Sequence, residues 1–153
     1  MDYKQWVREN LLEVAYSYHM NESAFVGCTP EEVHSVMKAQ GVEYLPQIYD
    51  ELLLLSGKTL AGVIPMCSLC SFDDLSDLKL DAVRVFSEEG LELPSNAFVF
   101  YNHLDHHIFY FLTEANEDNP VVFEYFEGKG IMKAYDHFSE FIIANHRDNL
   151  TYS

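Results

Sequence analysis

Residues 97–112 read AFVFYNHLDHHIFYFL, and this stretch determines how the rest of the chain is interpreted. Two aromatic and β-branched runs, residues 97–101 and 107–112, flank the polar segment 102–106. Such residues favour strands, and a short polar segment between two strand-like runs is typical of a hairpin. Rings occur at both alternating positions between residues 98 and 111, so we expect some ring on the sheet face away from the helices.

The C-terminal part of the chain repeats this pattern and then changes it. Residues 121–126 and 131–135 are again rich in aromatic and β-branched side chains, and the segment between them is Glu127-Gly128-Lys129-Gly130. Glycines between two such runs predict a second hairpin. Asp136 can then cap a closing helix whose apolar residues, from Phe138 onward, share one face.

The N-terminal part of the chain has helical periodicity. Between residues 3 and 20, apolar side chains recur at every third or fourth position, which predicts an amphipathic helix. The motif Thr29-Pro30-Glu31-Glu32 combines a hydroxyl N-cap, a proline in the first turn and a glutamate three residues after the cap. It predicts a second helix over about residues 30–40, which Gly41 ends.

The segment between residues 45 and 90 predicts two more helices. Pro46 opens a third helix that ends at Gly57, and Ser71 can cap a fourth. Residues 61–67 are short, apolar and compatible with a strand, and residues 78–85 also allow a strand as an alternative to the fourth helix. The apolar positions of the fourth helix are Leu75, Leu78, Ala82 and Phe86.

Together these elements predict a single α+β domain over residues 1–153, with the tail 146–153 frayed. We expect a mainly antiparallel sheet of about five to six strands packed with α-helices. The length of 153 residues is that of one ordinary domain, and 48% apolar residues are enough for one core.

The charge disfavours one class of partner. The chain has 9 Lys and Arg against 25 Asp and Glu, a net charge of −16, which disfavours direct contact with a nucleic-acid backbone. Residues 73–118 contain 11 of these acids against Lys79 and Arg84, a net −9. Such a stretch suits a basic partner, and solubility alone is the alternative explanation.

The sequence also indicates in which compartment the protein is located. The first ten residues mix charges into what would be the apolar part of a signal peptide. The longest uncharged stretch, residues 59–72, is broken by Pro65 and is shorter than the ~20 residues that span a bilayer. Three cysteines are too few for a disulfide framework. We therefore expect a cytoplasmic protein that does not bind a membrane.

The sequence favours neither a metal site nor a catalytic site. Cys67 and Cys70 have the spacing of zinc ligands, and His103, His106 and His107 could complete a site, but the cysteines lie in an apolar stretch typical of core. We therefore predict no metal, no cofactor and no catalytic residue. Paired carboxylates such as Glu31-Glu32 are better explained by helix capping than by acid–base catalysis.

Five segments in this order resemble the SUKH superfamily. They are Gly27-Cys28-Thr29-Pro30-Glu31-Glu32-Val33, Leu45-Pro46-Gln47-Ile48-Tyr49, Leu93-Pro94 before Phe98, Pro120-Val121-Val122-Phe123-Glu124-Tyr125, and Asp136-His137-Phe138-Ser139-Glu140-Phe141-Ile142. The resemblance implies an α+β fold and, for most members, a bacterial immunity protein that binds a cognate toxin domain without catalysis. The toxin is often a nuclease, whose phosphate-binding surface is basic, and an acidic protein can cover that surface.

The expected contact surface follows from charge and predicted exposure. Its members are Asp73, Asp74, Asp77, Glu88, Glu89, Asp105, Glu117 and Asp118. The alternative function is a regulatory or scaffold module of the same fold that binds an endogenous protein or peptide. An enzyme is the third, least supported alternative. The sequence leaves both a monomer and a homodimer open.

Overall fold

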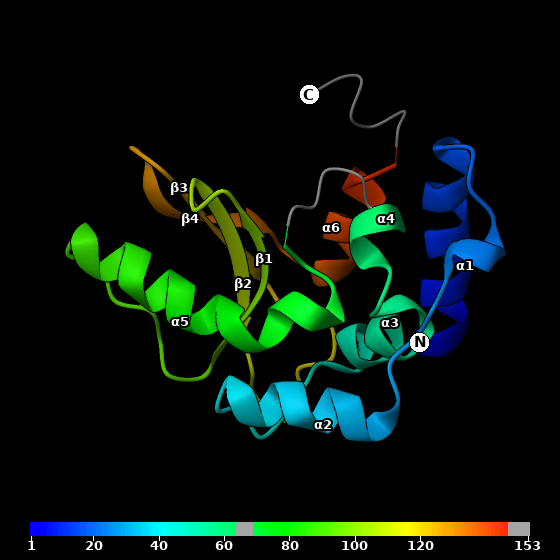
Figure 1. The fold of residues 1–153 in the computed structure, drawn as a ribbon, viewed down its shortest axis with the longest axis horizontal. Coiled ribbons are helices and arrows are strands. Elements are labelled where there is room, and N and C mark those ends of the chain that lie inside the picture. The colour runs from blue at the N-terminus through cyan, green and yellow to red at the C-terminus, as the bar shows by residue number, and fades with distance from the viewer. Residues whose placement is uncertain (64–68, 147–153) are drawn as a thin grey trace.

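A four-stranded antiparallel sheet, in the order β1-β2-β3-β4, lies at the centre of the fold (Figure 1). The computed structural model describes residues 1–63 and 69–146. In chain order the elements are α1 (Tyr3–Ser17), a 3₁₀ turn (Glu22–Ala24), α2 (Pro30–Ala39), α3 (Gln47–Ser56), α4 (Leu60–Val63), α5 (Phe72–Glu88), β1 (Ala97–His103), β2 (His107–Leu112), β3 (Val122–Phe126), β4 (Gly130–Tyr135) and α6 (Phe138–Ala144). The α+β class is confirmed.

The sheet has fewer strands than the predicted five to six. The strand expected at residues 61–67 is wrong at its start, because α4 occupies Leu60–Val63, and residues 64–68 lie outside the described part. Leu60 and Val63, at the two ends of this helical turn, are buried. Leu69 forms only an isolated bridge with Asn102 of β1.

Helices cover both faces of β1 and β2 (Figure 1). On one face, Phe86 of α5 packs against Tyr110 and Tyr125, with ring centroids 6.2 and 5.0 Å apart. On the other face, Phe100 lies 5.2 Å from Phe138 of α6 and 6.0 Å from Tyr49 of α3. Every Phe and Tyr ring from residue 98 to residue 111 is buried, so the expected outward ring on this hairpin is wrong. The two helical layers explain why aromatic residues occur at both alternating positions.

The outer edge of β1 is closed by a buried side chain. The amide of Gln40, at the C-terminal end of α2, is 2% exposed. Its Oε1 accepts a hydrogen bond from Val99 N–H at 2.8 Å, and its Nε2 donates to the Val99 carbonyl at 2.8 Å and to the Leu75 carbonyl at 2.7 Å. One amide thus joins α2, α5 and β1 and imitates a neighbouring strand.

The helix ends mostly follow the predicted capping chemistry. The capping box of Thr29 and Glu32 is present at the start of α2, and Gly41 has a φ of +68° after its end. Gly57 follows α3 in right-handed helical conformation, and a side chain there would collide with Cys28 Sγ and Leu53 O. Close packing around position 57 therefore explains the glycine there. A positive φ does not, because the residue is in the right-handed region.

Two helix ends differ from prediction. α1 ends at Ser17 because His19 has a φ of 62°, which a continuing helix does not allow. Asp136 does not cap α6. His137 is the N-cap residue, and the Asp136 carboxylate accepts a hydrogen bond from Lys133 Nζ at 2.6 Å. The Asn119 side chain instead accepts the Ser139 N–H at 2.9 Å.

No helix within the described residues combines the length and the apolar character that crossing a bilayer requires.

Gln40→Leu tests the closed edge. The variant leaves the N–H and the carbonyl of Val99 without partners and removes the additional hydrogen bond to the Leu75 carbonyl, and each unsatisfied group costs about 1–3 kcal/mol. We expect the free energy of unfolding, measured in urea, to fall by about 3 kcal/mol. Gln5→Leu on the exposed face of α1 is the matched control and should change stability by less than about 0.5 kcal/mol. Equal effects of the two substitutions would contradict this role of Gln40.

Candidate partner-binding surface

The turn between β1 and β2 has an unusual backbone. His106 N–H donates to the His103 carbonyl at 3.0 Å, and both residues inside the turn have positive φ, 54° at Leu104 and 59° at Asp105. Glycine and asparagine normally supply this conformation, and a leucine in it is strained. The Leu104 side chain is 68% exposed, so burial of this leucine does not offset the strain.

Side chains of β1 and α5 hold the turn in place. The buried Asn102 donates to Asp105 Oδ1 at 2.8 Å, and Asn102 Oδ1 accepts the Asp105 N–H at 2.9 Å. Arg84 of α5 donates to Asp105 Oδ2 at 3.0 Å. The hydrogen bond from Asn102, and then the Arg84 guanidinium, lower the pKa of the Asp105 carboxyl below its usual value. The strained leucine is therefore fixed to the body of the protein.

Leu104 has an exposed apolar neighbour. Leu69, before α5, is 38% exposed. A hollow of about 400 Å³ is lined by Leu69, Asp81, Arg84, Asn102, Leu104 and Asp105. Large apolar side chains in water next to a hollow are typical of protein-binding surfaces.

Carboxylates surround this apolar centre. A second hollow of about 150 Å³ shares Arg84, Leu104 and Asp105 with the first and adds Glu88, Glu89 and Glu127. Tyr125 donates to Glu89 Oε1 at 2.6 Å, and burial, followed by the Glu89 carboxylate, raises the pKa of Tyr125 to about 12. We call the residues of these two hollows the hairpin-tip surface.

The structure brings together only some of the acids predicted from the sequence. Glu88, Glu89 and Asp105 lie on the hairpin-tip surface. Asp77 is exposed one helical turn before Asp81, whereas Asp73 and Asp74 lie in the first turn of α5, roughly 20 Å from Glu88 at 1.5 Å per residue.

The last two predicted acids lie at the opposite end of the sheet. Glu117 and Asp118 follow β2, whose six residues separate them from the hairpin tip by about 20 Å. Asp118 has a structural role there, because its carboxylate accepts the Gln47 N–H at 3.3 Å and its carbonyl accepts the Ile48 N–H at 3.2 Å. The eight predicted acids therefore do not form one surface.

Residues 27–144 match the family model described as SMI1 / KNR4 family (SUKH-1). The chain belongs to the SMI1/KNR4 family (SUKH-1). The resemblance expected from the sequence is thus confirmed over most of the domain. Neither a curated protein nor a solved structure matches the chain.

The hairpin-tip surface of this SUKH-1 chain contains residues that the sequence analysis missed. Leu69 comes close to Leu104 through its isolated bridge with Asn102, which no local pattern predicts. Leu104 is an apolar residue inside a polar turn, which is visible in the sequence. Asp81 and Glu127 come near Leu104 through tertiary packing, and the count of charges along the sequence did not single them out as contact residues.

Two histidines near the β1–β2 turn of this SUKH-1 chain contact carboxylates. His106 Nδ1 contacts Glu127 Oε2, and His107 Nε2 lies 2.7 Å from Glu124 Oε2. Cys70 is buried, and Cys67 lies outside the described residues. Within residues 1–63 and 69–146, no group of three or more His, Cys, Asp or Glu residues is arranged to hold a metal ion.

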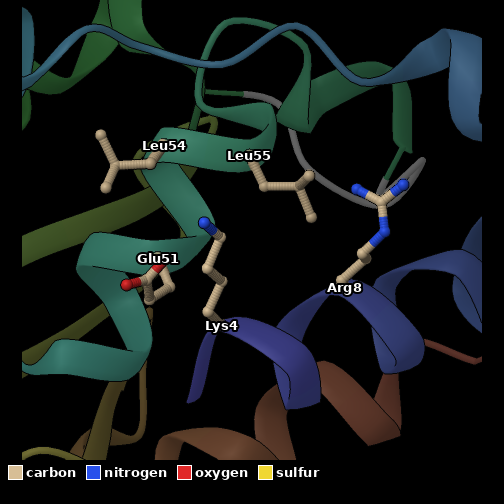
Figure 2. A pocket seen from close by; sticks show the side chains of 5 residues that line it. All are labelled: Lys4, Arg8, Glu51, Leu54 and Leu55. Carbon is tan, nitrogen blue, oxygen red and sulfur yellow. The ribbon is translucent and has the colours of Figure 1, made fainter. Parts of the chain in front are cut away.

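A further hollow, of about 220 Å³, lies between α1 and α3 (Figure 2). Lys4 and Arg8 of α1 and Glu51, Leu54 and Leu55 of α3 line it. Arg8 is paired with Glu22. The two cations would repel a basic partner, so this hollow does not extend the acidic surface.

Leu104→Asn tests the strain in the turn. Asparagine tolerates positive φ, and the left-handed conformation costs other L-residues about 1–2 kcal/mol. We expect the variant to be more stable than the natural protein by about 1 kcal/mol in urea unfolding. Leu80→Asn removes an equally exposed leucine from a helix, and it should lower stability slightly. A destabilised Leu104→Asn variant would show that this leucine supports the fold.

Asp105→Asn tests the electrostatic clamp. A carboxyl with a lowered folded pKa adds stability above its unfolded pKa, about 3.9, and that stability is lost as the pH falls through the folded value. The stability difference between the natural protein and Asp105→Asn should therefore be largest near neutral pH and shrink below about pH 4. Urea unfolding at several pH values measures it, and a constant difference would contradict the clamp.

Proposed function

We propose that this SUKH-1 protein is an immunity protein that binds a cognate toxin domain stoichiometrically and neutralises it without catalysis. The observation that carries the proposal is the exposed Leu104, held in a strained conformation beside the exposed Leu69. Backbone strain that costs stability and buries nothing is typical of residues selected for recognition. Family membership supports the same function.

The surroundings of Leu104 indicate the chemistry of the toxin surface. Carboxylates of Asp81, Glu88 and Glu127 surround an apolar centre, and the whole chain carries −16. A complementary partner has an apolar pocket bordered by lysine or arginine, as on the phosphate-binding surface of a nuclease. The acidic field would accelerate encounter, and the leucine would slow dissociation.

Co-expression tests the proposal. We expect co-expression with the toxin domain encoded immediately upstream to keep the cells alive and to give a one-to-one complex on purification. Leu104→Asn should lower the affinity of the purified complex at least about tenfold while the free protein stays folded. Folded protein that neither rescues the cells nor co-purifies would favour the regulatory or scaffold module that binds an endogenous partner.

Charge reversal tests which acids face the toxin. The triple variant Asp81→Lys, Glu88→Lys and Glu127→Lys should slow association strongly and remove most of its salt dependence. The matched control reverses three exposed acids away from the hairpin tip, Asp73, Glu114 and Glu117, with the same change in net charge. The control should have a much smaller effect. If the two triple variants slow association equally, the hairpin-tip assignment is wrong.

A further inference from the structure

Helix α5 has an exposed apolar pair of its own, separate from Leu104. The helix forms the outer layer over one face of β1 and β2 (Figure 1). Leu80 is 72% exposed and Val83 is 47% exposed, whereas five other apolar residues of the helix are buried. The two lie three residues apart, which places them on the same side of the helix. Large apolar side chains kept in water side by side are typical of contact with another protein.

The spacing on this side of α5 is that of a helix-packing seam. Ser76, Leu80, Val83 and Ser87 follow one another at intervals of four, three and four residues. Alternating intervals of three and four keep side chains on one side of a helix, and they are the geometry of a left-handed contact between two helices. The serines at the two ends are small, so a second helix can approach Leu80 and Val83 closely. We call these four residues the α5 seam.

The α5 seam has an acidic border. Each seam residue is followed by a charged residue, and these are Asp77, Asp81, Arg84 and Glu88. Arg84 is bonded to Asp105 at 3.0 Å and lies 4.0 Å from Asp81 and 3.8 Å from Glu88. The last two distances exceed those of hydrogen bonds, so both carboxylates can accept donors from a partner. The border is therefore negative even with Arg84 included.

We infer that the α5 seam binds an amphipathic α-helix of a partner protein. Leu80 and Val83 pack against the apolar side of that helix. Its lysines or arginines face Asp77 and Asp81. Charge selects this occupant, because a second copy of the chain would bring a net −16 to the same acids, and an anionic membrane would be repelled by them. A toxin domain or an endogenous protein can carry such a helix, so the α5 seam does not depend on the proposed function.

A synthetic helix tests the α5 seam without any toxin. The seam peptide has about 18 residues, roughly five turns, with leucines at alternating intervals of three and four residues and lysines beside them. NMR titration of the isotopically labelled full chain should give amide shift changes concentrated over residues 76–88. A second peptide of the same composition has its leucines distributed around the helix, and it should bind at least about fivefold more weakly because it has no apolar side.

Variants of the full chain test the two kinds of contact. Leu80→Ser should weaken binding of the seam peptide at least about fivefold, because it removes the more exposed of the two apolar side chains. Its matched control is Tyr16→Ser on α1, which removes a side chain that is 58% exposed. Asp77→Lys should weaken binding at least about threefold, and Glu13→Lys makes the same charge change at an exposed position of α1.

Both controls should bind the seam peptide within about twofold of the natural protein. All four substituted positions are exposed, so thermal melts should show folded protein.

Four results would overturn the α5 seam. They are no binding at about 1 mM peptide, shift changes without a maximum in α5, equal binding of the two peptides, and variants no different from their controls. None of these results bears on the proposed function, because its test uses the toxin domain and Leu104.

Discussion

The side-chain amide of Gln40 is the interaction on which the arrangement of the other elements depends. It bonds the edge strand β1 at Val99 and the backbone of α5 at Leu75, and the carbonyl of the same residue accepts Lys79 Nζ at 2.7 Å. Lys79 also donates to the Ser95 carbonyl at 2.6 Å, just before β1. These bonds fix the axial position of α5 against the sheet. A shift of one helical turn, about 5.4 Å, would separate Arg84 from Asp105.

The hairpin-tip surface follows from that position. Arg84 reaches the β1–β2 turn because α5 is held along β1, and Asn102 reaches Asp105 because its own backbone is bonded to Leu69. The two side chains together hold Leu104 in a conformation that the residue does not favour alone. Stability gained in the buried part of the sheet thus offsets strain at an exposed leucine. A rigid support that holds a strained, exposed residue is expected at a surface that has been selected for binding a partner.

Much of this architecture could be predicted from local patterns. The aromatic runs around residues 102–106 and around Glu127–Gly130 became the two hairpins, and the period of α5 correctly favoured a helix over the alternative strand. Residues 61–63 were misassigned because so short an apolar run does not distinguish a helical turn from a strand. Asp136 was expected to cap a helix, but Lys133 three residues earlier competes for its carboxylate.

The candidate surface was harder to predict from the sequence. Counting charges along the sequence selected acids from both ends of the sheet. The density of acids in the sequence does not show that Asp118 binds the backbone at the start of α3, or that Asp105 pairs with Arg84. The positive φ of Leu104 arises from tertiary contacts and opposes its local preference, so no propensity argument predicts it.

The central claim is that the hairpin tip and the second half of α5 contact the toxin. Hydrogen exchange of the free protein and of its complex with the toxin domain tests it most directly, because protection reports which backbone segments become buried or ordered. The account predicts new protection over residues 80–89 and 102–106, with α1 and α3 little changed. Protection confined to α1 and α3, around the hollow of Lys4 and Arg8, would contradict it.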